Sequence, residues 1–208
     1  MADHNYRFSN DWFGIARETW SKLLPQIQPS KILEIGSFEG RSACFMIDTL
    51  ASSQPLELHC VDSWETEPEY KSYHANMESV SERFNRNTAT AIQNAAHPVD
   101  LHVHKGRSDM LLSRLLTEGK RGYFDFIYID GSHQAADVLC DAVLGFRLLR
   151  QGGVIAFDDY LYSEQTSIGI DPLRSPKPAI DAFVNLYCRK LRVIQAPLYQ
   201  LYIHKIGD

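Results

Sequence analysis

Hydrophobic positions along the chain follow two alternating spacings. Short β-branched runs predict five strands, at residues 31–35, 56–61, 99–104, 123–129 and 153–157. Longer stretches with apolar residues at helical spacing predict helices at 40–51, about 67–93, 108–118 and 134–150, the last of them ending at Gly152-Gly153. Regular alternation of strand and helix is typical of a parallel sheet with helices on both faces and right-handed crossovers.

Both ends of the chain depart from this alternation. An amphipathic stretch at about 12–24 predicts a packing helix before the first strand, closed off by Pro25. A helix at about 178–189 is followed by two short strands, 191–196 and 198–204, which lie too close together for a crossover helix and must pair antiparallel. The predicted fold is an α/β, doubly wound, mostly parallel seven-stranded sheet with a C-terminal antiparallel hairpin, in which ligands bind at the carboxyl ends of the strands.

Composition and length favour one domain. The 208 residues are 44% hydrophobic and 23% charged, and no repeat or long linker divides them. We therefore expect a single domain over 1–208, with a helical extension at 1–25 and a lid at 65–94 that carries Tyr70, Tyr73, His74 and Phe84. The segment 161–178 is expected to be a long loop beside the site.

Charge and cysteine usage exclude several classes. A net charge of -5 argues against a nucleic-acid partner, which demands a basic face. The four cysteines are far apart and form no Cys/His cluster of zinc-ligand spacing, so they are expected to be buried thiols of a reducing compartment. There is no apolar leader and no apolar run near the roughly 18 residues of a membrane span. We expect a cytoplasmic protein without a membrane anchor.

The first predicted strand leads into a glycine-containing turn, Glu34-Ile35-Gly36-Ser37-Phe38-Glu39-Gly40. Glycine allows a sharp turn and a close ligand approach, and the next helix offers free N–H groups. The turn lacks the G-x-G-x-x-G spacing that cradles a pyrophosphate, and its two acids would oppose a diphosphate. A carboxylate at Glu34 suits a cationic ligand, such as a sulfonium; the alternative is a tight turn without a ligand.

Asp62 ends the second predicted strand and is followed by Ser63 and Trp64. An acid at this place in a doubly wound fold accepts hydrogen bonds from two ribose hydroxyls, although it can also cap a helix. Trp64 is placed to lie on a purine ring or, alternatively, to pack in the core. With the preceding turn, the pattern indicates a ligand that has a ribose and a positive charge but no pyrophosphate.

Three acids follow the fourth and fifth predicted strands. Asp130 begins Asp-Gly-Ser-His, and Asp158 and Asp159 follow a buried run. Adjacent parallel strands would gather these carboxylates, which would raise one another's pKa values unless a hard divalent cation such as Mg²⁺ joined them. The alternative is that they cap the following segments. His133 beside this site is a candidate general base, against the alternative that it is structural.

These residues together resemble the class I S-adenosylmethionine-dependent methyltransferases, and among them the metal-dependent small-molecule O-methyltransferases of the catechol and macrocin type. The resemblance covers about 32–204 and implies S-adenosylmethionine and a divalent cation as cofactors and a small hydroxylated acceptor. It places Glu34, Gly36, Ser37 and Gly40 around the methionine part and Asp62 on the ribose. It also implies adenine contacts from Gly106, Arg107 and Ser108, and metal ligation by Asp130, Asp158 and Asp159.

Two departures from the catechol-type pattern leave the base open. Asp158-Asp159 stands where those enzymes usually have Asp-Asn, which favours the macrocin-like branch. His133 stands where they carry a lysine base, so His133 and Asp130 are both candidate catalytic residues. Two other functions remain as alternatives: a nicotinamide-dependent reductase and a non-catalytic nucleoside-binding module on the same fold. Trp12 and Trp20 on the N-terminal helix serve either packing or a homodimer face.

Overall fold

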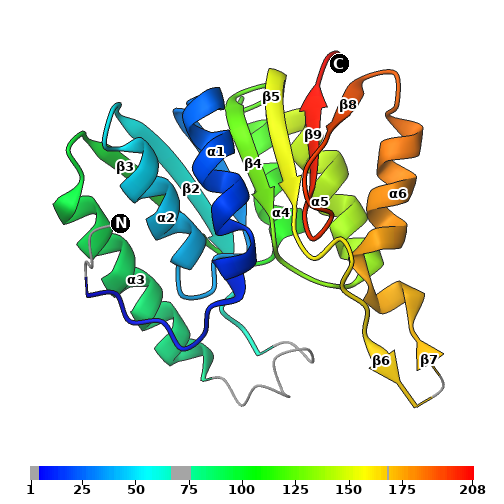
Figure 1. The fold of residues 1–208 in the computed structure, drawn as a ribbon, viewed down its shortest axis with the longest axis horizontal. Helices are drawn as coiled ribbons and strands as arrows, with labels where there is room; N and C mark the ends of the chain where they lie inside the picture. Colours follow the sequence, from blue (N-terminus) through cyan, green and yellow to red (C-terminus); the bar gives the residue numbers. More distant parts are fainter. Residues whose placement is uncertain (1–4, 67–75, 168) are drawn as a thin grey trace.

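The computed structural model describes residues 5–66, 76–167 and 169–208, and in them a seven-stranded sheet of order β3-β2-β1-β4-β5-β9-β8 (Figure 1). The strands β1 to β5 pair parallel, and β9 pairs antiparallel with both β5 and β8. This confirms the predicted fold class. The strands are β1 (Lys31–Ile35), β2 (Leu56–Asp62), β3 (Val99–Lys105), β4 (Phe124–Ile129), β5 (Leu149–Phe157), β8 (Leu191–Ile194) and β9 (Leu201–Lys205).

Helices cover both faces of the sheet and bury one apolar core on each side. The core on one face contains side chains of α1, α2 and α3, and the core on the other face contains those of α4, α5 and α6. Consecutive strand residues alternate between the two cores, as Ile32 and Leu33 do in β1. The helices are α1 (Arg17–Ile27), α2 (Arg41–Leu50), α3 (Met77–Asn94), α4 (Ser108–Thr117), α5 (Ala135–Leu148) and α6 (Pro176–Leu186).

The hydrogen-bond ladder continues for one residue past the carboxyl ends of the central strands. Gly36 N–H donates to the carbonyl of Val61, Asp130 N–H to that of Ile35, and Asp158 N–H to that of Ile129. These bonds hold the turns after β1, β4 and β5 next to one another at the carboxyl ends of the parallel strands. The sheet thereby brings together the residues that the sequence placed at separate strand ends.

Several predicted boundaries are wrong. The strand predicted at 198–204 begins at Leu201, and the helix predicted at about 178–189 ends at Leu186. Pro25 lies inside α1, which continues to Ile27 because Trp20 and Leu24 anchor it in the core and a proline removes only one helical hydrogen bond. The helix α5 ends at Leu148, not at Gly152-Gly153, because Leu149 already pairs with Phe124 in the sheet. The two glycines lie within β5, where the register against β4 shifts.

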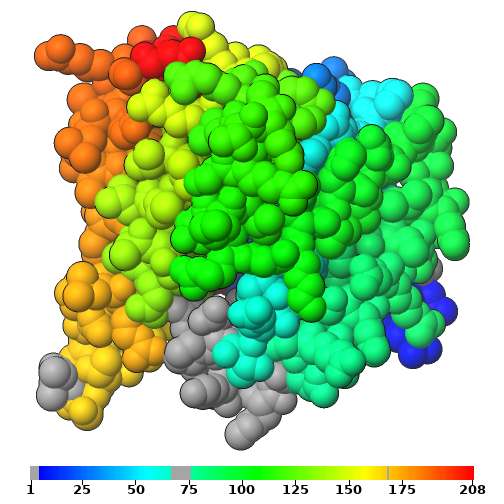
Figure 2. Space-filling model, turned by 180° about the vertical axis from the view of Figure 1, so that it is seen from behind, coloured from blue at the N-terminus to red at the C-terminus, as the bar shows by residue number. Residues whose placement is uncertain are grey.

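The segment after β5 was expected to be a loop, but it contains two short strands. β6 (Gln165–Thr166) and β7 (Gly169–Ile170) pair antiparallel and project from the body of the molecule in Figure 1. Figure 2 shows the same segment at one corner of the face that α4 and α5 cover. The 3₁₀ turns η1 (Trp12–Ile15) and η3 (Pro172–Arg174) complete the described elements.

The expectations for the cysteines, for the lid and for membrane spans can each be compared with the described residues. Cys44 and Cys60 are buried as expected, but Cys140 is half-buried and Cys188 is exposed, because α5 and the end of α6 present them toward solvent. The predicted helix from about residue 67 begins at Met77 in the described part, and Tyr70, Tyr73 and His74 of the expected lid lie outside it. No helix among the described residues is long and apolar enough to cross a membrane.

Candidate active site

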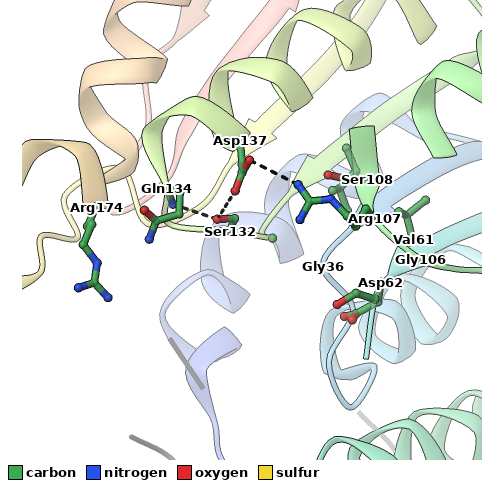
Figure 3. Close-up of a pocket in the computed structure, with 13 residues that line it drawn as sticks. Gly36, Val61, Asp62, Gly106, Arg107, Ser108, Ser132, Gln134, Asp137 and Arg174 are labelled. Carbon is green, nitrogen blue, oxygen red and sulfur yellow. Dashed lines mark hydrogen bonds and ion pairs between the residues drawn. The ribbon is translucent and has the colours of Figure 1, made fainter. Parts of the chain in front are cut away.

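Two adjoining cavities open at the carboxyl ends of the central strands. The first cavity, of about 390 Å³, is lined by the turns after β1, β2, β3 and β4, with Arg174 of η3 on its far side (Figure 3). The second cavity, of about 220 Å³, lies between the N-terminal segment, the turn after β1 and the turns after β4 and β5. Gly36, Asp62 and Gly131 line both, so the two cavities meet at these residues. Their sizes suit a small organic ligand.

Gly36 is the one position of the first turn that no other residue can fill. Its φ is +86°, and a Cβ there would lie 1.9 Å from the carbonyl oxygen of Asp130. Gly40 has φ +78° and begins α2, but it packs against the Phe84 ring, which a Cβ would approach to 2.9 Å. Gly36 and Ser37 thus line a cavity as predicted, whereas Gly40 faces the core between α2 and α3.

Glu34 lies beneath the turn after β1 and not on a cavity wall. Its carboxylate is fully buried and accepts hydrogen bonds from Ser37 Oγ at 2.6 Å and Ser42 Oγ at 2.5 Å. Burial raises the pKa of Glu34 to about 7, although both hydroxyl contacts act in the opposite direction. The expectation that Glu34 meets a cationic ligand is corrected: it holds the turn that lines the cavities.

Asp62 holds the same turn from the neighbouring strand and also faces both cavities. Its Oδ2 accepts the backbone N–H groups of Ser37 and Phe38, both at 2.9 Å, and its Oδ1 accepts that of Trp64 at 2.7 Å. A carboxylate has about four acceptor positions, so one remains for a ligand hydroxyl. The structure therefore gives Asp62 a ligand-facing position, and in place of the helix cap that was the alternative, Asp62 holds the turn after β1.

The indole of Trp64 belongs to the core. It is 5% exposed, packs against the Phe84 ring at 4.9 Å and donates its Nε1–H to the carbonyl of Phe38. It does not line the first cavity, so the expectation of a purine contact is corrected. The φ of +44° at Trp64 turns the chain sharply after Asp62 and directs the ring inward, away from the cavity that Ser63 lines.

The remaining wall of the first cavity comes from the turns after β3 and β4. Gly106, Arg107 and Ser108, for which the resemblance implied adenine contacts, line it. Figure 3 shows Asp137 of α5 between Arg107, whose Nη2 is 4.0 Å from its Oδ1, and Ser132, whose Oγ donates to its Oδ2 at 3.1 Å. These side chains place hydrogen-bond donors and acceptors along the wall of the first cavity, where a ligand could contact them.

The parallel pairing of β4 and β5 brings the three predicted aspartates to the second cavity. The hydroxyl of Tyr128 lies within hydrogen-bond distance of both Asp130 Oδ2 and Asp158 Oδ2. Burial, followed by the charges of Asp158 and Asp159, holds the pKa of Asp130 well above its usual range, and burial raises the pKa of Asp158 to about 6. The predicted mutual rise in pKa is thus present: without a cation, this end of the site favours the neutral form of its carboxyl groups.

Asp159 connects the aspartates to His133. His133 Nε2 lies 2.9 Å from Asp159 Oδ2, and the hydroxyl of Tyr199 donates to Asp159 Oδ1 at 2.9 Å. The imidazole also packs against the Tyr162 ring at 4.3 Å. These contacts fix the orientation of His133 at the wall of the second cavity.

An aromatic wall of the second cavity comes from the N-terminal segment and from Phe38 of the turn after β1. It was missed by sequence reasoning, which offered packing or a homodimer face for the N-terminal aromatic residues. The wall consists of Phe8, Trp12, Phe13 and Phe38, opposite Tyr162 and Tyr199. Ser9 fixes the segment by donating its N–H at 2.6 Å and its hydroxyl at 2.7 Å to the carboxylate of Glu39. The signal in the sequence was the density of aromatic residues before the first helix.

Sequence reasoning also missed a group of metal-ligand type that contains no cysteine. Among the residues that the structure describes, one ligand atom each of Glu57, His59 and His102 lie within 4.8 Å of one another, and no other such group is present there. The group contains no cysteine, so the expectation about a Cys/His cluster is unaffected by it. The signal was Glu-x-His on one strand and His-x-His on the next, because alternate strand residues share a face.

A family model matches more than half of the chain. Residues 33–160 match the family model described as "Methyltransferase domain". A Dictyostelium discoideum protein named "Probable caffeoyl-CoA O-methyltransferase 3" is 24% identical over 173 residues, 83% of this chain and 59% of that relative. The chain therefore spans less than two thirds of the length of this curated relative.

Solved structures share the fold at low sequence identity. The O-methyltransferase TomG from Streptomyces achromogenes, solved in complex with SAM, has a TM-score of 0.64 at 20% identity, over 93% of this chain and 80% of its own. An O-methyltransferase from Bacillus cereus in complex with SAH has a TM-score of 0.61 at 19% identity, over 95% of this chain and 84% of its own. At such identities the likeness establishes the arrangement of strands and helices.

Proposed function

The chain belongs to the methyltransferase-domain family, and from this premise we propose that it transfers a methyl group from S-adenosylmethionine to a hydroxyl group of a small molecule, assisted by a divalent cation. One observation carries the proposal. The two cavities meet at Gly36, Asp62 and Gly131, so a ligand that fills the first cavity presents one end to the acidic wall of the second. Such a pair accommodates a methyl donor and an acceptor in contact.

The first cavity supplies the groups that an adenosyl ligand requires. Asp62 retains an acceptor position for a ribose hydroxyl, and Ser63 lies beside it. Gly106, Arg107 and Ser108 would flank the adenine, and Gly36 with Ser37 would contact the methionine part. The SAM and SAH complexes of the two similar structures support this choice of ligand.

The acidic wall of the second cavity offers oxygen ligands for a hard divalent cation, although the three carboxylates do not converge within 4.8 Å of one another among the described residues and would have to draw together around the ion. Asp130 and Asp158 are half-buried, and burial together with the neighbouring carboxylates raises their pKa values, so a cation there would favour their ionised forms. We assign the ligand role to Asp130, Asp158 and Asp159, whose oxygens suit Mg²⁺. When bound there, Mg²⁺ would lower the pKa of an acceptor hydroxyl and orient its oxygen.

The residues of the chain position the acceptor and take up its proton. In the transfer, the acceptor oxygen forms a bond to the methyl carbon, the carbon–sulfur bond breaks, and the sulfonium becomes a neutral thioether. The hydroxyl proton leaves to His133, which Asp159 and Tyr162 hold in place, or to Asp130. The aromatic wall of Phe8, Trp12, Phe13 and Phe38 limits water around the reacting groups.

The two candidate bases are distinguished by the acidity of the acceptor. If His133 takes the proton, His133→Gln loses activity on an alcohol but keeps it on a nitrophenol that is already ionised at neutral pH. If Asp130 takes it, Asp130→Asn shows that difference between acceptors and His133→Gln does not. Methyl transfer measured by mass spectrometry with both acceptors decides between them.

A thermal-unfolding experiment tests the proposed function against its alternatives. S-adenosylhomocysteine at about 100 times its Kd should stabilise the chain by about 2.7 kcal/mol, roughly 5–10 °C for this length, whereas NADH should have no effect. Stabilisation by NADH alone would establish the reductase instead. Binding of S-adenosylhomocysteine without transfer to any hydroxylated acceptor, with or without Mg²⁺, would establish a non-catalytic nucleoside-binding module.

A further inference from the structure

A second group of metal-ligand type lies on the edge of the sheet, apart from both cavities. We define the histidine cluster as Glu57 and His59 of β2 with His102 and His104 of β3. The two strands pair in parallel with His59 opposite His102, and each pair of residues is separated by one position. All four side chains therefore emerge on the same face of the sheet.

That face is the one covered by α4 and α5, shown in Figure 2. Val61, two residues beyond His59, belongs to the core on this face, and the His59 ring meets the Phe124 ring edge-on at 5.1 Å. His59 is 2% exposed, whereas the His102 side chain is 40% exposed. The cluster thus extends from the buried sheet to the solvent at the β3 edge, which gives an ion a path of entry.

The ligand atoms converge. One oxygen or nitrogen from each of Glu57, His59 and His102 lies within 4.8 Å of the other two. His59 Nε2 is 2.8 Å from Glu57 Oε1, and the rings of His59 and His102 stack at 4.3 Å. A cation placed among the three would replace the proton that now joins His59 Nε2 to Glu57 Oε1.

Neighbouring groups hold these ligands in position. His59 Nδ1 is 2.9 Å from His104 Nε2, and His102 Nε2 is 3.1 Å from Asp100 Oδ2. Partners of this kind fix the tautomer and the ring orientation of metal-binding histidines. A buried, central strand such as β2 is expected to be apolar on this face, so an acid and a histidine two residues apart are costly to keep there for packing alone.

We propose that Glu57, His59 and His102 bind a zinc-class transition-metal ion that cross-links β2 to the edge strand β3. Two imidazoles and a carboxylate suit Zn²⁺, Co²⁺ or Ni²⁺ and not Mg²⁺, which prefers oxygen ligands. The site is therefore chemically distinct from the aspartates at the ends of β4 and β5, and its presence or absence leaves the proposed methyl transfer untouched.

Lys120 provides an internal check on this assignment. Its Nζ lies 3.2 Å from Glu57 Oε1, so the ammonium competes with any cation for that oxygen. Removal of the ammonium by Lys120→Met should tighten metal binding, because, among the described residues, the Glu57 carboxylate then keeps only the Tyr123 hydroxyl and the His59 ring as partners and has lost its one fixed positive charge. A hydrogen-bond network with no affinity for metal would show no such gain.

The test is a Co²⁺ titration of the full chain, followed by visible absorption, with excess Mg²⁺ present to occupy the aspartates. One equivalent should bind with ligand-field bands, and His102→Gln or Glu57→Gln should weaken binding more than about tenfold. The matched control is His204→Gln, a half-buried histidine on β9, which should bind Co²⁺ as the parent does. Unfolding curves establish that each variant is folded.

Three results would overturn the proposal: no ligand-field bands at any Co²⁺ concentration, equal affinity in the parent and His102→Gln, or loss of Co²⁺ binding in Asp158→Asn but not in Glu57→Gln. A fourth result, unchanged or weaker binding in Lys120→Met, would also contradict it. Because His102 is partly exposed, its replacement is expected to keep the fold, so the comparison with the parent remains interpretable.

Discussion

The turn after β1 and the turns after β4 and β5 meet at the same cavities but are built in opposite ways. Around Gly36 the backbone lines the cavities. The carboxylates of Glu34 and Asp62 hold this turn by accepting hydrogen bonds from serine hydroxyls and backbone N–H groups, which occupy most of their acceptor positions. Around Asp130 and Asp158 the side chains make the wall, and they share one tyrosine hydroxyl.

The difference teaches which part of the site is complete and which part needs a ligand. The turn after β1 is already satisfied, so it can receive a donor without rearranging. The aspartate wall is crowded with like charge, so it gains most from a cation. Substitutions in the turn after β1 should therefore impair folding and donor binding, whereas substitutions of the aspartates should lower the rate of methyl transfer.

The largest effect is expected at Gly36. Gly36→Ala places a Cβ 1.9 Å from the backbone oxygen of Asp130, a contact that only a shift of two strand ends can relieve, and should cost more than about 4 kcal/mol of unfolding free energy. Gly119→Ala is the matched control, because Gly119 has a φ of +85° but no atom within 4 Å of an added Cβ. It should cost only about 1–2 kcal/mol. Equal losses in urea unfolding would show that backbone strain, not the contact with Asp130, makes Gly36 necessary.

On the aspartate side, Asp130→Asn should lower kcat by about 10²–10⁴-fold, whether Asp130 serves as metal ligand or as base. The Kd for S-adenosylhomocysteine should change little, since Asp130 does not line the first cavity. Asp181→Asn is the control: Asp181 accepts a hydrogen bond from Tyr160 at 2.7 Å outside both cavities. Normal turnover by Asp130→Asn would remove the aspartates from the reaction.

Glu34 links the first turn to pH. Its pKa is raised from 4.5 to about 7 in the folded chain, so the folded state binds a proton that the unfolded state has released between those values. Its contribution to stability therefore falls as the pH rises from about 4.5 to about 7. Glu34→Gln cannot titrate, so its unfolding free energy relative to the parent should increase by about 3 kcal/mol across this range. If the difference in unfolding free energy between Glu34→Gln and the parent, measured in urea, does not change with pH, burial does not raise the pKa of Glu34.

The smallest effect is expected at Arg107. Its side chain is 61% exposed and faces Asp137 at 4.0 Å, so screening by solvent limits its contribution. Arg107→Ala should weaken S-adenosylhomocysteine binding by no more than about threefold in calorimetry, less than about 1 kcal/mol. A loss of tenfold or more would mean that the guanidinium, and not the backbone of the turn after β3, carries the contact on that side.

Sequence periodicity predicted the sheet well where local signals and burial agree. The bounds of β1 match the prediction, and Gly36 and Asp130 lie at strand ends as expected. The junction of α5 and β5 was misplaced because Gly152-Gly153 is a typical helix stop, whereas the pairing of Leu149 with Phe124 is a long-range contact with no local mark. Where pairing between distant residues determines the end of a helix or strand, the neighbouring sequence carries no signal for that end.

The site was predictable in position but not in the direction of individual side chains. The sequence placed Glu34 and Trp64 at the correct turns, yet both point into the protein, since the φ of +44° at Trp64 and the serine hydroxyls around Glu34 arise only in the folded turn. The wall from Phe8 and Trp12 depends on contacts such as Ser9 with Glu39, which are 30 residues apart in the chain. Such contacts have no periodic signature.

The most direct test is a crystal structure of the chain with S-adenosylhomocysteine and Mg²⁺. The account predicts the adenosine in the first cavity, a ribose hydroxyl on Asp62, and the sulfur directed to the second cavity, with the ion on Asp130, Asp158 and Asp159. An adenosyl ligand bound elsewhere, or in the reverse orientation with its sulfur away from the aspartates, would contradict the proposed transfer.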